Sequence, residues 1–197
     1  MVSSCVKNKI FSKQFKLLPY KGLVVRKNNL VTTIDKWGPN FNIKFSLKIL
    51  KKPTDWRNLL HLTTGEDCCQ KGTRTPAIFL NSDANNVYML VCIALGEGKK
   101  SPRRTDTWYW MDLHRWYNIE MTQKNGNFSL KVNDTLEWMT ESVDQALTRV
   151  NWYQGDKWYK PAVAWVNSFE NMVQFKHLRV KNNGTDLRFL DQFSRKR

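Results

Sequence analysis

Hydrophobic and polar residues alternate with a period of two over much of this chain. In the stretch FNIKFSLKIL, which begins at Phe41, every second side chain from Phe41 to Ile49 is apolar and those between are polar or charged. Successive side chains of a β-strand point to opposite faces of its sheet, so this pattern is typical of a strand with one buried and one solvated face. It therefore predicts an antiparallel strand over residues 41–50.

The same alternation occurs in RWYNIEM and in NFSLKV, on either side of the polar segment TQKNGN. Asn125 and Gly126 both tolerate the positive φ angles of a type I′ turn, so the two stretches predict a β-hairpin. In MVQFKHLRV the alternation slips by one step after Phe175. A slip of this kind predicts a β-bulge near Lys176 and His177.

Further strands are predicted from NLVTTI, NLLHLT, PAIFL and NVYMLVCIAL. The last is apolar on both faces, which predicts a central strand covered by a second sheet. TESVDQALTRV, residues 140–150, predicts one short helix with Thr140 as its N-cap. About eight to ten short strands separated by turns predict an all-β fold, a two-sheet antiparallel sandwich of the jelly-roll type with at most one short helix. We expect an N-terminal arm over 1–16, the sandwich domain over 17–183 and a basic tail over 184–197.

Composition supports one folded domain and adds a strong positive charge. The 197 residues are 41% hydrophobic, and Lys and Arg exceed Asp and Glu by 32 to 17, a formal charge of +15. Such a charge favours an acidic partner, which could be nucleic acid, a sulfated or sialylated glycan or an anionic membrane surface. The alternative is a solubilising surface, because the cations are scattered from Lys7 to Arg197. No apolar stretch reaches the roughly 18 residues of a membrane span.

Two adjacent cysteines mark a polar loop, TTGEDCCQKGTRTPAIF. Cys68 and Cys69, together with Cys5 and Cys92, make an even number. We expect a disulfide that involves the adjacent pair, with Cys92 in a strand beneath the loop; reduced packing cysteines are the alternative. Arg74 is expected to order the loop through carbonyl groups or a carboxylate such as that of Asp67.

Three segments together resemble a known superfamily: NLLHLTTGEDCCQKGTRTPAIFL, WYNIEMTQKNGNFSLKVNDT and VNWYQGDKWYKPAVAWVNSF. They are similar to jelly-roll domains of the concanavalin A-like lectin and glucanase superfamily, with the closest likeness to those of invertebrate secreted and surface proteins. The resemblance covers residues 17 to about 182. It implies a domain that binds carbohydrate or protein ligands, or in some members hydrolyses glucans. Function still depends on sites grafted onto the fold.

The residues argue against an enzyme and against a cofactor. A retaining glucanase needs two carboxylates on one strand face. Glu137 and Glu141 have a suitable spacing, but they are expected at a solvated helix start. Adjacent cysteines do not suit one tetrahedral zinc ion. Calcium is the one alternative to no cofactor, and its oxygen ligands would come from two loops: Glu66, Asp67, Asp83 and Asn85.

Two aromatic clusters, TDTWYWMD and NWYQGDKWYK, are the candidate ligand-binding segments, because exposed aromatic rings beside polar groups suit sugar recognition. The candidate binding residues are Trp108, Trp110, Trp152, Asp156, Trp158, Tyr159 and Arg74. About half of the aromatic rings are expected to be buried instead. The candidate basic patch lies in a predicted loop, where a solvated connection is the alternative: Lys99, Lys100, Arg103 and Arg104.

Three Asn-x-Ser/Thr triplets, at Asn127, Asn133 and Asn183, are candidate glycosylation sites and favour an extracellular or cell-surface location. The N-terminal residues lack the apolar centre of a signal peptide, so the chain is either cytosolic or part of a longer protein. We expect a non-enzymatic, lectin-like domain for an extracellular glycan, with acidic or sulfated glycans as one option, or for a glycoprotein. A protein–protein adhesion module is the alternative. A heparin-like polyanion is a candidate partner, and no motif indicates specific nucleic-acid binding.

Overall fold

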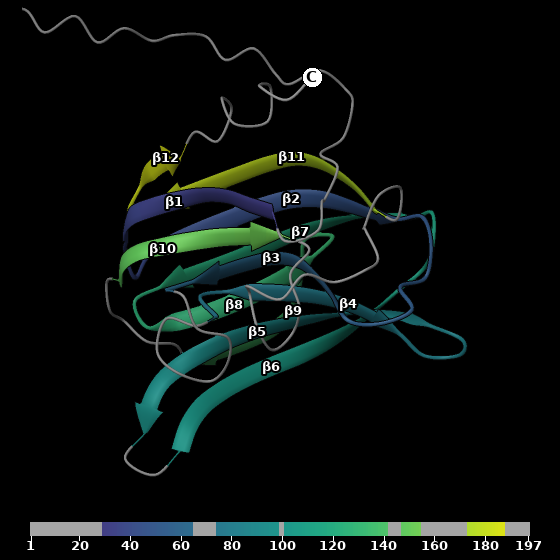
Figure 1. The fold of residues 1–197 in the computed structure, drawn as a ribbon, viewed down its shortest axis with the longest axis horizontal. Coiled ribbons are helices and arrows are strands. Elements are labelled where there is room, and N and C mark those ends of the chain that lie inside the picture. The colour runs from purple at the N-terminus through teal and green to yellow at the C-terminus, as the bar shows by residue number, and fades with distance from the viewer. Residues whose placement is uncertain (1–28, 65–73, 99–100, 142–146, 155–172, 188–197) are drawn as a thin grey trace, which may run out of the picture.

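The computed structural model describes residues 29–64, 74–98, 101–141, 147–154 and 173–187 (Figure 1). All regular structure in these ranges is β-strand, arranged in two six-stranded antiparallel sheets that form a sandwich. This confirms the predicted all-β fold. The described residues contain no helix long and apolar enough to cross a membrane. The division of the chain into arm, domain and tail stays a prediction.

Sheet A lies in front in Figure 1 and has the order β1-β10-β3-β4-β5-β6. Its strands are β1 (Asn29–Trp37), β10 (Leu147–Gln154), β3 (Arg57–Thr63), β4 (Ala77–Ser82), β5 (Val87–Gly98) and β6 (Ser101–Met111). Sheet B lies behind it and has the order β12-β11-β2-β7-β8-β9. Its strands are β12 (Thr185–Leu187), β11 (Val173–Asn182), β2 (Phe41–Ile49), β7 (Trp116–Lys124), β8 (Asn127–Val132) and β9 (Thr135–Glu141).

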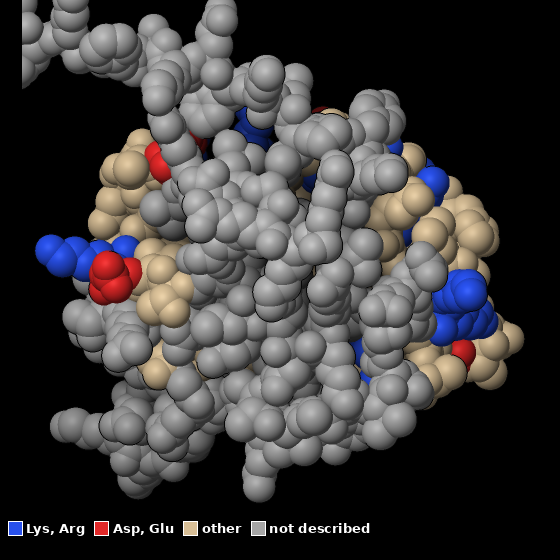
Figure 2. All heavy atoms as spheres, turned by 45° about the horizontal axis from the view of Figure 1, so that its top comes forward, with Lys and Arg blue, Asp and Glu red and all other residues tan. Residues whose placement is uncertain are grey.

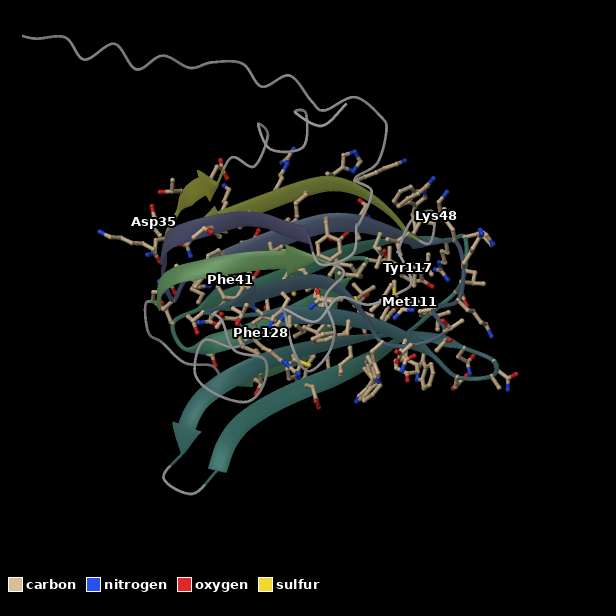
Figure 3. The ribbon with its side chains drawn as sticks, in the orientation of Figure 1. Asp35, Phe41, Lys48, Met111, Tyr117 and Phe128 are labelled. Atoms are coloured by element: carbon tan, nitrogen blue, oxygen red, sulfur yellow. The ribbon has the colours of Figure 1, made fainter. Side chains whose placement is uncertain are left out.

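The core fills the space between the sheets with alternate side chains of each strand. In β2 every second residue from Phe41 to Ile49 is buried, which confirms the strand predicted from its periodicity. Phe41 stacks near Trp37 of β1, with ring centroids 5.0 Å apart, and so joins the two sheets. Figure 3 shows Phe41 and Phe128 toward one end of the molecule, and Met111 and Tyr117 toward the other; all four are buried. Among the described residues, the inward face of each sheet is therefore packed against the other sheet.

Two local predictions about turns and bulges are confirmed. Asn125 and Gly126 connect β7 to β8 with φ angles of 51° and 72°, as a type I′ turn requires. The pairing of β11 with β2 shifts register between Lys176 and Arg179, and His177 has a φ of 54°. The bulge keeps the apolar residues on both sides of it directed into the core.

The predicted short helix over residues 140–150 is wrong where the structure describes it. Thr140 lies in β9 opposite Phe128, and Val150 lies in β10 opposite Ile34. Residues 142–146 are outside the described part of the chain. Pairing along two sheets supplies backbone hydrogen bonds and burial that outweigh a weak local preference for helix.

One expectation about β5 is confirmed and one about β6 needs correction. β5 is an interior strand of its sheet, paired with β4 on one side and with the edge strand β6 on the other. Its outward side chains are apolar because sheet A carries a second, smaller apolar cluster on its outer face. The segment expected as a basic loop is largely strand: Arg103 and Arg104 belong to β6 and pair with β5, so only Lys99 and Lys100 lie outside the described residues. Figure 1 shows the two strands extending together away from the sandwich.

Candidate functional site

The outer face of sheet A presents a group of aromatic rings to solvent. Successive residues of β6 alternate in direction, so Tyr109 packs against the core while Trp108 and Trp110 point outward. Trp108 is 50% exposed and Trp110 is 57% exposed. The register of β5 and β6 places Tyr88 directly opposite Trp110. This confirms the expectation that only part of the TDTWYWMD cluster is buried.

These two tryptophans belong to a contiguous aromatic surface, which we define as Trp56, Tyr88, Trp108 and Trp110. Ring centroids are 4.9 Å apart for Tyr88 and Trp108, and 5.3 Å apart for Tyr88 and Trp110. Trp56 contacts both Trp108, at 5.6 Å, and Tyr88, at 5.8 Å. Tilted and edge-to-face pairs at such distances are mutually attractive. The exposed rings are therefore braced by their neighbours on a paired strand.

The base of the aromatic surface is buried. Trp56 also meets Phe79 edge to face at 6.4 Å, and Phe79 belongs to the small apolar cluster that covers this side of sheet A. Burial raises the pKa of the Tyr88 phenol, and the charge of Asp83 raises it further. Tyr88 is therefore neutral at physiological pH, and its hydroxyl can donate or accept a hydrogen bond.

A layer of buried polar side chains continues the outer face beside the aromatic surface. Cross-strand pairing aligns Asn58 with Phe79, and His61 with Ala77 and Cys92. Arg74 donates from Nη1 to the Cys92 Sγ at 3.8 Å, and its guanidinium lies 5.1 Å from the Phe79 ring. The side chains of this layer are all buried. These side chains pack beside the aromatic surface, and because they are buried they are not accessible to a large ligand.

Asn58 is unusual within this layer. It is fully buried, and neither its Oδ1 nor its Nδ2 has a hydrogen-bond partner among the described residues. The neighbouring Arg57 Nε is also without one, although Arg57 Nη1 donates to the carbonyl of Trp56 at 3.1 Å. Buried amides are almost always hydrogen-bonded, so such an exception calls for a physical explanation.

The predicted binding residues divide into four groups. Trp108 and Trp110 are brought together on the aromatic surface, whereas Arg74 lies in the buried polar layer. Trp152 belongs to β10 opposite Leu62, with its side chain outside the described atoms. Three candidates lie outside the described residues altogether: Asp156, Trp158 and Tyr159.

Two members of the aromatic surface were not among the candidates. Tyr88 carries a weak sequence signal, since it is the one aromatic residue at the outward positions of an otherwise apolar strand. Trp56 lies just before β3 and reaches the surface only because β3, β4, β5 and β6 are neighbours in the sheet. That neighbourhood is set by pairing between distant segments and leaves no local pattern.

The remaining candidate sites are placed as follows. Cys92, fully buried in β5, is the only cysteine within the described ranges, and Cys5, Cys68 and Cys69 lie outside them. The disulfide therefore stays a prediction. Asn127, Asn133 and Asn183 are all exposed at or beside turns between strands. Glycosylation at these positions also stays a prediction.

The calcium ligands considered from the sequence do not form a cluster in the described residues. Asp83 Oδ1 accepts hydrogen bonds from the backbone N–H groups of Asn85 and Asn86, at 2.8 and 2.7 Å, and these bonds lower its pKa. The arrangement is a self-contained polar turn. Glu66 and Asp67 lie outside the described residues. Within those residues, no three His, Cys, Asp or Glu side chains come close enough to hold a metal ion.

The carboxylate pair also needs correction. Glu137 and Glu141 both lie in β9, at the edge of sheet B, and not at the start of a helix. Glu137 is exposed, and the side chain of Glu141 is outside the described atoms. The expectation that this pair lies at a helix start is therefore wrong, and the pair lies on the opposite sheet from the aromatic surface.

The two antiparallel sheets define an all-β sandwich, and the aromatic surface lies on the outer face of one of them. No protein-family model matches the chain, and no curated protein matches its sequence. Solved structures with a similar fold include a SAP-like pentraxin from Limulus polyphemus, with 10% identity and a TM-score of 0.48 over 87% of this chain and 74% of the pentraxin. The closeness to invertebrate proteins stays a prediction.

Two other solved structures are similar at the same level. The PL7 alginate lyase AlyA1 from Zobellia galactanivorans shares 14% identity and a TM-score of 0.47 over 75% of this chain. The match spans 65% of the lyase, just under two thirds of its length. The carbohydrate-binding module CBM66 from Bacillus subtilis shares 11% identity and a TM-score of 0.39 over 77% of this chain and 78% of the module. At these identities the likeness concerns the fold alone.

The matches to alginate lyases contradict the prediction that the protein is not an enzyme. The prediction rested on the missing carboxylate pair, and that criterion tests only for hydrolysis of a glycosidic bond. It says nothing about other reactions on a polysaccharide.

Proposed function

We propose that this protein binds a carbohydrate chain through the aromatic surface on sheet A. The observation that carries the proposal is the half exposure of Trp108 and Trp110, side by side on one strand and braced by Tyr88 and Trp56. Large aromatic rings are normally buried, and exposed ones at a well-packed position are typical of binding surfaces. Their flat faces suit stacking against the apolar faces of sugar rings.

The spacing of the two exposed rings favours an oligosaccharide over a single sugar. Residues two apart on one face of a strand are separated by about 7 Å, so Trp108 and Trp110 present two platforms in a row. Because both belong to β6, paired along its length with β5, the two platforms keep a fixed relation to one another. A ligand that spans both rings gains binding free energy from each of them, and little conformational entropy is lost because the rings are already held in place.

We also propose that the protein acts outside the cell or at its surface. The exposure of all three glycosylation candidates supports this location, since an acceptor asparagine must be accessible to be modified. Expression in secreting eukaryotic cells, followed by treatment with a peptide-N-glycosidase, should give a loss of mass at Asn127, Asn133 or Asn183. An unmodified secreted protein would count against this location.

The binding proposal is tested with a glycan array followed by calorimetric titration of any ligand that the array identifies. Trp108→Ala combined with Trp110→Ala should weaken binding at least about tenfold, because each stacked ring contributes on the order of 1 kcal/mol. The matched control is Leu136→Ala with Met139→Ala, which removes two exposed apolar side chains from sheet B. The length of the bound glycan is followed in the same samples, so that cleavage is distinguished from binding.

A second candidate, protein–protein adhesion, is favoured by a separate observation. Leu136 and Met139 are 52% and 65% exposed on β9, which is an edge strand of sheet B. Exposed apolar residues on an edge strand offer both backbone groups and side chains to a partner. A protein partner whose binding is lost in the Leu136→Ala, Met139→Ala control but is unaffected by glycosidase treatment would favour adhesion.

A further inference from the structure

The outer face of sheet B has a different chemistry from that of sheet A. Its outward positions on the two neighbouring strands β2 and β11 are Asn42, Lys44, Ser46, Lys48, Gln174, Lys176, Arg179 and Lys181. Among the described residues of β2, β7, β8, β11 and β12, the acidic side chains are Glu120 and Asp186. Positive charge therefore predominates on this face, which we call the basic face.

Cross-strand pairing brings the cations close together. Arg179 lies directly opposite Lys44, and like charges in opposed positions of a sheet destabilise it. Glu120 of β7, on the other side of β2, forms an ion pair with Lys44, with Lys44 Nζ and Glu120 Oε1 2.8 Å apart. Partial burial raises the pKa of Glu120, but the hydrogen bonds from Lys44 and Asn42 and the charge of Lys131 outweigh it, and the pKa lies below its ordinary value.

The positive charge is concentrated at Trp116. Lys48 lies opposite Trp116 in the pairing of β2 with β7, and its Nζ is 5.0 Å from the centre of the indole ring. Lys176 reaches the same ring from β11, with its Nζ 4.0 Å from the centre. Each ammonium group is attracted to the ring, but the two groups repel each other. Figure 2 shows Lys and Arg side chains at the end of the molecule where Figure 3 labels Lys48.

Neutral hydrogen-bonding groups are interleaved with these cations. Ser46 Oγ donates to Asn118 Oδ1 at 2.9 Å, and Asn118 is exposed beside Trp116 on the same face. His177 places its Nδ1 3.4 Å from the same Ser46 hydroxyl. Amide, hydroxyl and imidazole groups can bond sugar hydroxyls, whereas the ammonium groups can pair with sulfate or carboxylate. The combination suits an acidic sugar chain better than a bare array of lysines would.

We infer that the basic face binds an anionic polysaccharide, sulfated or rich in uronate, which lies across β11, β2 and β7 with an acidic group at Lys48, Trp116 and Lys176. Such a group lowers the repulsion between the two ammonium ions while leaving both cation–π contacts in place. This site is on the opposite sheet from the aromatic surface, so it stands independently of the function proposed there. The inferred site differs from the basic patch predicted from the sequence, which lies at the connection between β5 and β6.

The test uses heparin as the probe, titrated by calorimetry at several salt concentrations. Lys48→Gln combined with Lys176→Gln should weaken binding roughly tenfold and flatten the dependence of affinity on salt, because fewer counterions are released. The control, Lys36→Gln with Lys51→Gln, removes the same charge at exposed positions off the basic face and should change binding little. The thermal midpoints of both variants should match that of the parent protein.

Three results would overturn the inference. Equal losses in the two double variants would show that binding follows net charge alone. No heparin binding by the parent protein at physiological salt would show that the face has no such ligand. Duplex DNA, or vesicles with anionic lipids, bound as tightly as heparin and weakened equally by Lys48→Gln with Lys176→Gln would show no preference for sugar. The Trp108→Ala, Trp110→Ala protein should bind heparin normally, which separates this site from the proposed carbohydrate surface.

Discussion

Asn182 joins two turns that are far apart in the sequence. Its Oδ1 accepts from the N–H of Gly38 at 3.0 Å, and its Nδ2 donates to the Gly38 carbonyl at 3.2 Å. Asn182 is buried at the end of β11, and Gly38 lies between β1 and β2. One side chain thus satisfies both backbone polar groups of Gly38, which lies in the connection between the two sheets.

Replacing Asn182 by Ala should therefore lower the free energy of unfolding by about 1–3 kcal/mol, the cost of leaving buried donors and acceptors unpaired. Urea denaturation measures this change. Asn127→Ala removes an amide from an exposed position and should cost about 0.5 kcal/mol or less. Equal effects of the two substitutions would show that Gly38 finds other partners.

Asn58 should behave in the opposite way, because among the described residues its buried amide has no hydrogen bond to lose. Asn58→Leu keeps the branched shape of the side chain and removes two polar atoms that are unpaired among the described residues, so the free energy of unfolding should rise by about 1–2 kcal/mol. Asn127→Leu is the exposed control, with an expected change near zero. A clear loss of stability in Asn58→Leu would mean that this amide is hydrogen-bonded in solution.

At the scale of elements, the turn between β7 and β8 sets the register of the central hairpin of sheet B. Gly126 has a φ of 72°, a region that residues with a Cβ adopt at a cost. Gly126→Ala should therefore lower the free energy of unfolding by about 1 kcal/mol in urea denaturation. Lys124→Ala, at the exposed end of β7, should have little effect. Unchanged stability in Gly126→Ala would show that the turn relaxes to another type.

The elements that could be predicted from the sequence are those with a local cause. β2 shows its buried face directly, the Asn125-Gly126 pair specifies its own turn, and the slip after Phe175 marks the bulge at His177. The helix predicted over 140–150 failed because pairing of β9 with β8 and of β10 with β1 decides that region. β1 is distant in sequence from β10, and the residues of the segment itself do not indicate which strands it pairs with.

The candidate site was only partly predictable for the same reason. Trp108 and Trp110 could be found because alternation within β6 directs both to one face. Trp56 and Tyr88 join them only through the order of strands in sheet A. The basic face could not be predicted. Lys48 and Lys176 come from strands that are adjacent in space and remote in sequence, and only the pairing of these strands gathers the cations on one face.

At the scale of the whole molecule, the sandwich carries two outer faces of different character around one core. The outer face of sheet A is aromatic, with apolar and buried polar support, and that of sheet B is basic and hydrogen-bonding. Because the inward faces are packed in the core, substitutions of exposed residues on either outer face can change binding without changing the fold. The two proposed sites can therefore be tested separately in one protein.

The most direct test of the central claim, that the aromatic surface binds carbohydrate, follows the indole N–H signals of the tryptophans by NMR. During titration with the oligosaccharide that binds best on the array, the signals of Trp108 and Trp110 should shift together and saturate. The signal of Trp37, which is buried in the core, should not move. Assignment comes from single Trp→Phe variants. Saturable binding that leaves Trp108 and Trp110 unshifted would contradict the claim.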